Sequence, residues 1–286
     1  MTINLDSVPW GRDASPPKRS RPRGNHRGFA CHDSAMTEHE VGPSPPSSRP
    51  PRIVQAFRML RRLVMDRPYR DMMWLLWRRP ADAFQPFNDT APDRYPRIFG
   101  FVQETLGAQS ELRILSFGCS TGEEVFSLRR YFPRAAIKGI DVNAGNIAAA
   151  RGRLRRNPNA LLSFAIAGST TAEPTSVYDA IFCMAVLRHG SLGQPGVRHC
   201  DHLIRFEDFA ATIADFSRCL KPGGLLVIRH SNFRLCDTPA GAVFETVLRV
   251  PTNAKVKAKA PLFGPDNILI NGADYPDTVF RKLGSI

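Results

Sequence analysis

The sequence has no run of about 18 consecutive apolar residues, the length that a membrane-spanning helix needs. Its N-terminal part carries Asp6 and several arginines between Arg12 and Arg27, without the apolar segment of a secretory signal. These two absences lead us to expect a cytoplasmic protein with no transmembrane segment.

Paired cysteines are absent as well. The six cysteines are scattered without a Cys-x-x-Cys pair, at Cys31, Cys119, Cys183, Cys200, Cys219 and Cys236. This spacing favours reduced, buried thiols over a disulfide framework or a zinc site. The segment His199-Cys200-Asp201-His202 brings three metal-ligand types together, but no second cluster completes a site, so we expect no bound metal.

Acidic residues are too few to balance the basic ones, and the net charge is +13. Residues 1–80 hold 15 Lys or Arg against 7 Asp or Glu, whereas the rest of the chain holds 24 against 19. Most of the excess charge therefore lies outside the nucleotide-binding pattern described below. Nucleic acid is an alternative partner, but the mildly basic core does not favour it as the substrate.

Residues 1–51 are rich in Pro, Ser, Arg and Gly. Such a composition cannot bury enough apolar surface to offset the entropy lost on ordering, so a disordered basic arm is predicted. One alternative is that the arm binds nucleic acid or acidic lipid. Another is that translation begins downstream, at Met36 or Met59.

Residues 52–107 are predicted to form a helical cap or lid. Apolar residues recur at helical spacing over residues 53–79, and Pro68 divides that run into two helices. The alternative for residues 53–79 is weak contact with a membrane surface, because Trp74 and Trp77 are flanked by arginines, as in interfacial helices.

The most informative stretch runs from Leu112 to Glu124 and reads Leu-Arg-Ile-Leu-Ser-Phe-Gly-Cys-Ser-Thr-Gly-Glu-Glu. It predicts a buried strand ending at Phe117, then a turn of small residues, then a helix from Glu123 to Tyr131. A strand, a glycine turn and a helix in this order are typical of the first half of a nucleotide-binding βαβ unit. Taken alone, the pattern also fits an ordinary tight turn of an α/β protein.

Asp141 distinguishes these two interpretations. It ends a second short strand that begins at Ala136, and it lies 19 residues after Gly122. An acid in that place, about 20 residues beyond the glycine turn, can accept hydrogen bonds from ribose hydroxyls. The two features in register predict a site for a cofactor that carries a ribose.

Helices and strands alternate through the rest of the chain. Helices are predicted at 97–106, 144–156 and 206–220, strands at 161–167, 177–184 and 225–229, and an antiparallel edge hairpin from 267–271 and 278–282. The predicted fold over residues 108–286 is therefore α/β, a doubly wound, mostly parallel seven-stranded sheet with a C-terminal antiparallel hairpin and both faces covered.

The turn lacks the third glycine of the G-x-G-x-x-G pattern that nicotinamide and flavin dehydrogenases use. Gly118-Cys119-Ser120-Thr121-Gly122 instead resembles motif I of the class I S-adenosylmethionine-dependent methyltransferases. The resemblance covers about residues 110–232, and its other segments are Gly139–Asn143, Tyr178–Phe182 and Leu220–Ile228.

This resemblance implies S-adenosyl-L-methionine as the cofactor and a Rossmann-like domain around it. The residues implied to bind the cofactor are Gly118, Cys119, Ser120, Gly122, Glu123, Asp141, Val142, Gly168, Ser169, Cys183 and Met184. Among these, Asp141 is expected to bind the ribose and Val142 to lie against the adenine. Ser116 stands where many family members carry an acid, and Glu123 or Glu124 is an alternative source of that charge.

The motif I sequence is most similar to that of the chemotaxis-receptor glutamate methyltransferases. The pairs Phe182-Cys183 and His230-Ser231 also resemble segments of that family. The likeness fails after the fourth strand. That family has an Arg-Asn pair there, whereas this chain has Met184 to Gly190. A different acceptor is therefore expected.

We expect methyl transfer to a small-molecule or glycan-type acceptor by in-line displacement, which depends mainly on positioning. His189 and His230, just beyond the fourth and fifth strands, are the candidate bases if the acceptor must lose a proton. For each, the alternative is a loop histidine without a catalytic role. Two further functions fit the same sequence: methyl transfer to a protein or nucleic acid, and a non-catalytic binding module that acts through Trp74 and Trp77.

Overall fold

The computed structural model describes residues 52–78, 84–85, 90–107, 111–251, 261–272 and 274–284. The chain divides into two compact units, residues 1–58 and 59–286. The boundary falls within helix α1 (Arg52–Met65), so the described part of the first unit is the beginning of that helix. The predicted arm of residues 1–51 lies outside the described residues.

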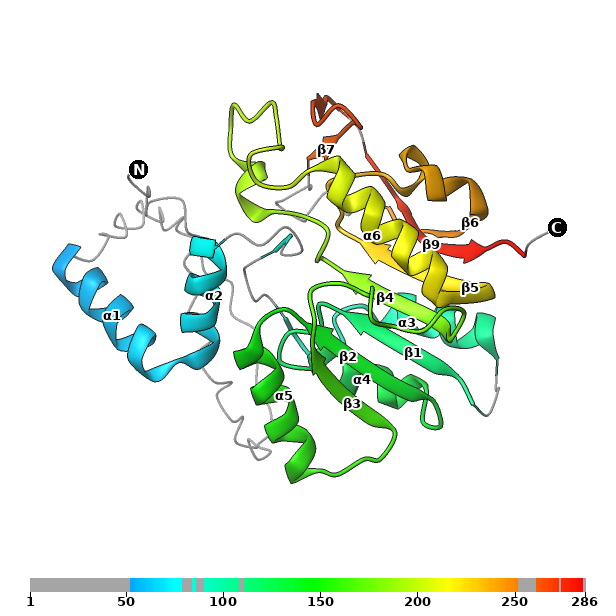
Figure 1. The fold of residues 1–286 in the computed structure, drawn as a ribbon, viewed down its shortest axis with the longest axis horizontal. Coiled ribbons are helices and arrows are strands. Elements are labelled where there is room, and N and C mark those ends of the chain that lie inside the picture. The colour runs from blue at the N-terminus through cyan, green and yellow to red at the C-terminus, as the bar shows by residue number, and fades with distance from the viewer. Residues whose placement is uncertain are drawn as a thin grey trace, which may run out of the picture. The chain divides into compact units, whose positions relative to one another are not determined.

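The second unit contains a seven-stranded sheet with the strand order β3-β2-β1-β4-β5-β9-β6 (Figure 1). Its strands β1 to β5 are parallel, and β9 is antiparallel to both β5 and β6. The order reverses between β1 and β4, which is where doubly wound sheets bind ligands at the carboxyl ends of their strands. The predicted fold class is confirmed. The strands are β1 (Arg113–Phe117), β2 (Ala136–Asp141), β3 (Leu162–Ile166), β4 (Tyr178–Met184), β5 (Leu220–Arg229), β6 (Phe244–Arg249) and β9 (Asp277–Lys282).

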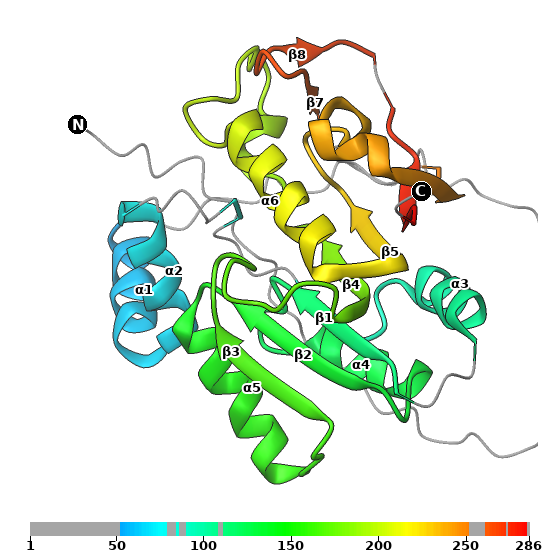
Figure 2. The ribbon, with the colours of Figure 1, turned by 45° about the vertical axis from the view of Figure 1, so that its right-hand side comes forward.

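The C-terminal antiparallel pair is confirmed, but the sequence assigned one of its strands to the wrong segment. The strand that pairs with β9 at the edge of the sheet is β6, whereas residues 267–271 contain β8 (Leu269–Ile270). That strand pairs with β7 (Leu262–Phe263) in a separate two-stranded sheet (Figure 2). The reason is that β6 lies at the sheet edge and buries none of its residues fully, so it lacks the alternation that reveals a half-buried strand.

The helices follow the predicted pattern closely. Pro68 lies in the first turn of α2, and the chain leaves the helical conformation at Asp66, so the division into two helices is confirmed. The cap formed by residues 52–107 stays a prediction. The helices after α1 are α2 (Arg67–Arg78), α3 (Pro96–Leu106), α4 (Glu123–Tyr131), α5 (Ala144–Arg156) and α6 (Phe206–Cys219).

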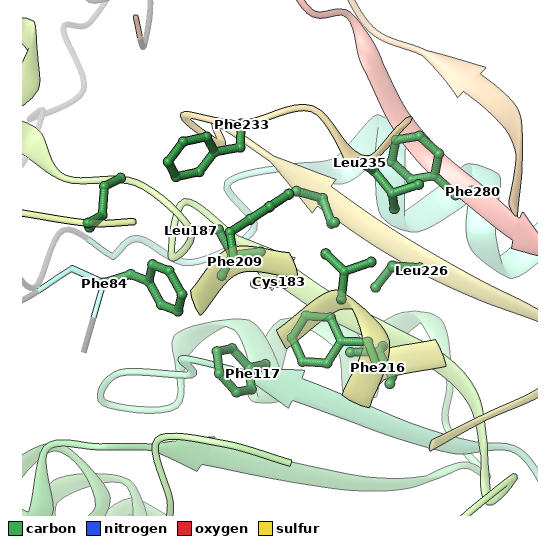
Figure 3. Close-up of a cluster of buried hydrophobic side chains, with 14 of the residues drawn as sticks. Phe84, Phe117, Cys183, Leu187, Phe209, Phe216, Leu226, Phe233, Leu235 and Phe280 are labelled. Carbon is green, nitrogen blue, oxygen red and sulfur yellow. The ribbon is translucent and has the colours of Figure 1, made fainter. Parts of the chain in front are cut away.

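Two hydrophobic clusters cover the two faces of the sheet. On one face α6 packs its apolar stripe against the sheet, and the rings of Phe216 and Phe117 meet edge to face with centroids 4.9 Å apart (Figure 3). On the other face α3, α4 and α5 contribute Phe99, Leu128 and Ile147. The fixed sheet between these layers holds the loops at its carboxyl edge in place.

Replacing Phe216 tests the α6 layer. Phe216 is fully buried, so Phe216→Ala removes its contacts and leaves a cavity that should lower the free energy of unfolding by about 3–5 kcal/mol. Urea denaturation would measure the change. The matched control is Phe57→Ala, at a ring that is 70% exposed, where we expect little effect. Equal losses in the two variants would contradict the packing described here.

Candidate functional site

The turn after β1 has three residues in the left-handed region, Gly118 (φ 71°), Ser120 (φ 50°) and Gly122 (φ 88°). The N–H groups of Gly118 and Cys119 both donate to the carbonyl oxygen of Ile140, at 2.8 and 2.9 Å. At Gly118 a Cβ atom would collide with the side chain of Val186. The glycines are therefore needed for the turn conformation itself and for close packing against the segment after β4.

The carboxylate of Asp141 joins this turn to β2 and α5. Its Oδ2 accepts from Ser120 N at 2.8 Å, and its Oδ1 accepts from Asn143 N at 2.8 Å and from Asn146 Nδ2 at 3.2 Å. Burial raises the pKa of Asp141, and these hydrogen bonds oppose the rise. A carboxylate offers about four acceptor positions, so these three bonds leave capacity for a ligand donor.

A second carboxylate lies at the end of β1. The hydroxyl of Ser116 donates to Glu124 Oε1 at 2.7 Å, and Ser116 is fully buried. Burial raises the pKa of Glu124 to about 7, while the Ser116 hydrogen bond and the charge of Arg94 oppose that rise. Helix α4 thus brings an acid to the strand position where the methyltransferase motif often has its own.

Glu123 has a different environment. Its carboxylate forms an ion pair with Arg153 of α5, whose Nη2 lies 3.3 Å from Glu123 Oε2. The same guanidinium lies 4.4 Å from the centroid of the Phe126 ring. Of the two acids that the sequence offered as a replacement for a strand acid, the one beside Ser116 is Glu124.

The end of β3 lies next to Asp141, because Ala167 N donates to the carbonyl oxygen of Asp141 at 3.1 Å. Gly168 and Ser169 follow directly, and the Ser169 hydroxyl lies 2.9 Å from that of Thr171. Val142, partly buried, follows Asp141 in the chain. The residues that the sequence grouped around an adenine therefore occur along one edge of the sheet.

The two cysteines of the predicted set are buried. Cys119 is 2% exposed and Cys183 is 0% exposed. Burial raises the pKa of both thiols well above the usual value, and the Glu124 carboxylate acts in the same direction. Neutral buried thiols are poor nucleophiles. Cys183 packs in the core cluster of Figure 3, and Met184, next to it, pairs with Arg229 in the sheet.

The two histidines lie on neighbouring loops but differ in chemistry. His189 is buried, and its Nδ1 accepts from Ser191 N at 3.3 Å, which leaves the proton of the neutral ring on Nε2. His230 has a left-handed backbone, with φ 57°, and its ring centroid lies 6.0 Å from that of Tyr95. Burial lowers the pKa of His230 to about 4, and three arginines add to that effect. His230 is therefore neutral near pH 7, and its lowered pKa makes it a weaker base than an ordinary histidine.

Sequence reasoning missed several supporting residues. Asn143 is the N-cap of α5, where its side chain accepts from Asn146 N at 3.0 Å, and both residues donate to Asp141. An Asn at the N-cap, followed by a second Asn three residues later, could have been recognised in the sequence as the start of the helix. The effect of Arg94 on Glu124 could not have been recognised in the sequence, because it depends on the conformation of the loop before α3.

The part of the chain that the structure describes holds no group of three or more His, Cys, Asp and Glu side chains suited to a metal ion. In the segment that suggested one, Cys200 is buried, and its Sγ lies 3.6 Å from the Oδ1 of Asn267. Among the described helices none is both long and apolar enough to cross a membrane.

Comparison with known proteins shows what this region is similar to. A family model described as a methyltransferase domain matches residues 115–226, from β1 into β5. The ubiquinone biosynthesis O-methyltransferase of Bordetella pertussis is 28% identical over 130 residues, which are 45% of this chain and 52% of that protein. An uncharacterized protein of Synechococcus is 28% identical over 152 residues, 50% of this chain and 33% of its own length.

Among solved structures, phosphoethanolamine N-methyltransferase 2 of Haemonchus contortus in complex with S-adenosyl-L-methionine is 17% identical, with a TM-score of 0.38. The match covers 59% of this chain and 35% of that one. The chain thus spans between a third and about half of the length of the curated relatives it matches.

The raised pKa of Glu124 makes stability depend on pH. In the unfolded chain this carboxyl ionises near its ordinary value of 4.5, but in the folded chain it ionises only near 7. The folded state therefore loses stability as the pH rises through this window. Over the window Glu124 should account for about 3 kcal/mol of that loss, and Glu124→Gln should remove it.

Urea denaturation at about pH 4.5 and about pH 7.5 measures this contribution. Asp141 acts in the same direction, and its contribution persists in the variant. Glu104→Gln, on the exposed side of α3, is the control and should behave as the natural chain. If the Glu124→Gln variant keeps the full pH dependence of its unfolding free energy, Glu124 is not the carboxyl group whose pKa is raised.

Proposed function

We propose that the chain transfers a methyl group from S-adenosyl-L-methionine to a small-molecule acceptor, a proposal supported by the match of residues 115–226 to a methyltransferase-domain family model. The observation that carries the proposal is the Asp141 carboxylate, which holds the glycine turn at the reversal point of the sheet and keeps acceptor capacity for a ribose hydroxyl.

The other residues fit the remaining parts of this cofactor. Val142, Gly168 and Ser169 lie along the edge that an adenine would follow, and the turn from Gly118 to Gly122 would line the methionine part. Glu124, in the first turn of α4 and beside Ser116 of β1, suits the cofactor's ammonium group. A cation beside this carboxylate favours its ionised form and would lower its raised pKa.

When bound, the cofactor would supply a methyl group carried on a positively charged sulfur. The sulfur would keep the electron pair of the carbon–sulfur bond when the acceptor atom takes the methyl group. The chain's own contribution is mainly to hold the two partners in line. Of the two histidines we assign His230 to accept a proton from an O–H or N–H acceptor, because Nδ1 of His189 already accepts from Ser191. With a pKa of about 4, His230 is a weak base in the chain without ligands.

The likeness to a ubiquinone biosynthesis O-methyltransferase supports an acceptor that is a small molecule. A glycan-type acceptor belongs to the same proposal. A protein or nucleic-acid acceptor recruited by residues 1–51 is the alternative, and that segment lies outside the described residues. Mass spectrometry of cell extracts incubated with isotopically labelled S-adenosyl-L-methionine would identify the labelled product.

Cofactor binding gives the first test. S-adenosylhomocysteine should bind the natural chain in calorimetry, and Asp141→Ala should weaken binding by about 1–3 kcal/mol, because the ribose hydroxyls then have no acceptor. Asp141→Asn keeps the size of the side chain and should also weaken binding. If S-adenosylhomocysteine does not bind the folded natural chain, the proposed function is wrong. If both variants bind it with unchanged affinity, Asp141 does not bind the ribose.

The two glutamates can be separated by the same method. Glu124→Gln should weaken S-adenosylhomocysteine binding by about tenfold, the effect of losing one charge-assisted hydrogen bond. Glu123→Gln should change it little, because that carboxylate is paired with Arg153. The reverse order of effects would assign the ammonium group to Glu123.

A second function is favoured by a specific observation, the exposed apolar residues of the second unit's N-terminal helices. Leu60, Val64 and Trp77 are 60%, 64% and 72% exposed, and Met65 and Trp74 are exposed as well. Exposed arginines accompany them at Arg61, Arg62 and Arg70. Apolar and basic side chains together suit the surface of an anionic membrane.

Vesicle flotation tests that contact. The chain should float with vesicles of phosphatidylglycerol and phosphatidylcholine, less at high salt, and less when Trp74 and Trp77 are both replaced by Ser. Leu161→Ser, at another exposed apolar residue, is the control and should float as the natural chain does. Equal recovery of the double variant would exclude the tryptophans as the contact.

A further inference from the structure

Asn232, in the loop after β5, is fully buried and uses all four of its polar groups. Its backbone N–H donates to the carbonyl oxygen of Leu187 at 2.9 Å, and its own carbonyl oxygen accepts from Phe263 N at 2.9 Å. Its side-chain Oδ1 accepts from His189 N at 2.8 Å, and its Nδ2 donates to the carbonyl oxygen of Pro261 at 2.6 Å. One residue therefore joins the loop after β4, the loop after β5 and the segment that contains β7.

The two side-chain bonds of Asn232 need an amide. One partner is a backbone N–H and the other is a backbone carbonyl, so the side chain must accept at one atom and donate at another. An uncharged carboxamide does both. An apolar side chain would leave two buried backbone groups without a partner, which is costly in the interior of a protein.

The segments that Asn232 joins are also fixed by packing. Phe233, the next residue, is fully buried and lies with Leu187 and Phe209 in the cluster of Figure 3. Its ring centroid is 5.3 Å from that of Phe209 and 6.5 Å from that of Phe263. The aromatic rings therefore hold one side of the junction, and the hydrogen bonds of Asn232 hold the other.

The backbone beside this junction has an unusual conformation. Ala185 and His230 are both left-handed, with φ 61° and 57°. They directly follow Met184 and Arg229, which pair in the sheet, and Ala185 N donates to the carbonyl oxygen of Arg229 at 2.8 Å. Residues other than glycine keep this conformation only where their surroundings enforce it, and such residues are frequent at functional sites. Asn232, two residues after His230, supplies part of that constraint.

We infer that Asn232 is a positioning residue of methyl transfer, which fixes the places of His189 and His230 at the carboxyl edge of β4 and β5. This inference rests on the proposed function. Because Asn232 is fully buried, it acts through the two loops and not by contact with the acceptor. In-line displacement depends on the placement of the reacting groups, so loss of the junction should slow the transfer. The residues proposed to bind the ribose and the methionine part belong to β2 and to the turn after β1, outside this junction.

Methyl transfer and cofactor binding, measured on the same variants of the full chain, test the inference. Asn232→Ala should lower transfer of label from S-adenosyl-L-methionine to the product formed in cell extracts by about 10- to 100-fold, whereas its affinity for S-adenosylhomocysteine should not change. Asn232→Asp keeps an acceptor for His189 N and should restore part of the transfer. Asn157→Ala, at an exposed Asn after α5, is the matched control and should transfer as the natural chain does.

Histidine NMR gives a readout that a loss of stability alone does not move, at a temperature where a thermal melt shows each variant to be folded. The signals are assigned through His189→Gln and His230→Gln. In Asn232→Ala both signals should shift. The pKa of His230 should rise from about 4 toward its ordinary value of 6.5, because its ring is no longer held in a buried place. Asn157→Ala should change neither signal.

Unchanged histidine signals in Asn232→Ala would overturn the inference, and so would unchanged methyl transfer. A parallel loss of S-adenosylhomocysteine affinity would overturn it as well, because Asn232 would then support the whole fold. If Asn232→Ala does not fold, Asn232→Asp decides the question. Its transfer must then lie below that of the natural chain, while its affinity for S-adenosylhomocysteine stays unchanged.

The natural chain keeps this result distinct from the proposed function. If it neither binds S-adenosylhomocysteine nor transfers the label, the proposed function fails, whatever the histidine signals do. If it does both and Asn232→Ala transfers at the same rate, the positioning role fails alone.

Discussion

The Asp141 carboxylate is the interaction on which the rest of the site depends. It accepts from three donors that belong to the glycine turn, the chain after β2 and helix α5. Without it the left-handed Ser120 would lose the partner of its N–H group, and the Asn146 side chain of α5 would lose its hydrogen bond to the end of β2. Burial raises its pKa, but the three hydrogen bonds favour the charged form and offset part of that cost.

Gly118 in the glycine turn is needed for two separate reasons. Gly118 adopts a left-handed conformation, and a side chain there would also collide with Val186 beyond β4. The turn after β1 and the segment after β4 therefore constrain each other. This contact lies at the reversal point of the sheet, where neighbouring strands carry their connections to opposite faces and their carboxyl ends stay open to a ligand.

Most of the fold could be predicted because its central parallel strands are buried on both sides and its helices have apolar stripes. The expected ranges of α4 and α5 coincide with the observed ones. β6 was missed because an edge strand without a buried side carries little pattern. Within the site, the glycine turn and the strand ending 19 residues after Gly122 singled out Asp141, and the structure places its carboxylate against that turn. The choice between Glu123 and Glu124 could not be made from the sequence, since it depends on Arg153 of α5 reaching one and on Ser116 facing the other.

Arg94 links the two ends of the site. It opposes the raised pKa of Glu124 and at the same time lowers the pKa of His230. The ionisation of Glu124 and the protonation of His230 are therefore not independent. When Glu124 ionises, its negative charge offsets part of the field of Arg94, and the imidazole becomes easier to protonate. The replacement of a strand acid by Ser116 and Glu124 thus moves the titrating carboxylate within reach of an arginine that also acts on the candidate base. The charge of the carboxylate beside Ser116 and the basicity of His230 are thus coupled through one guanidinium group.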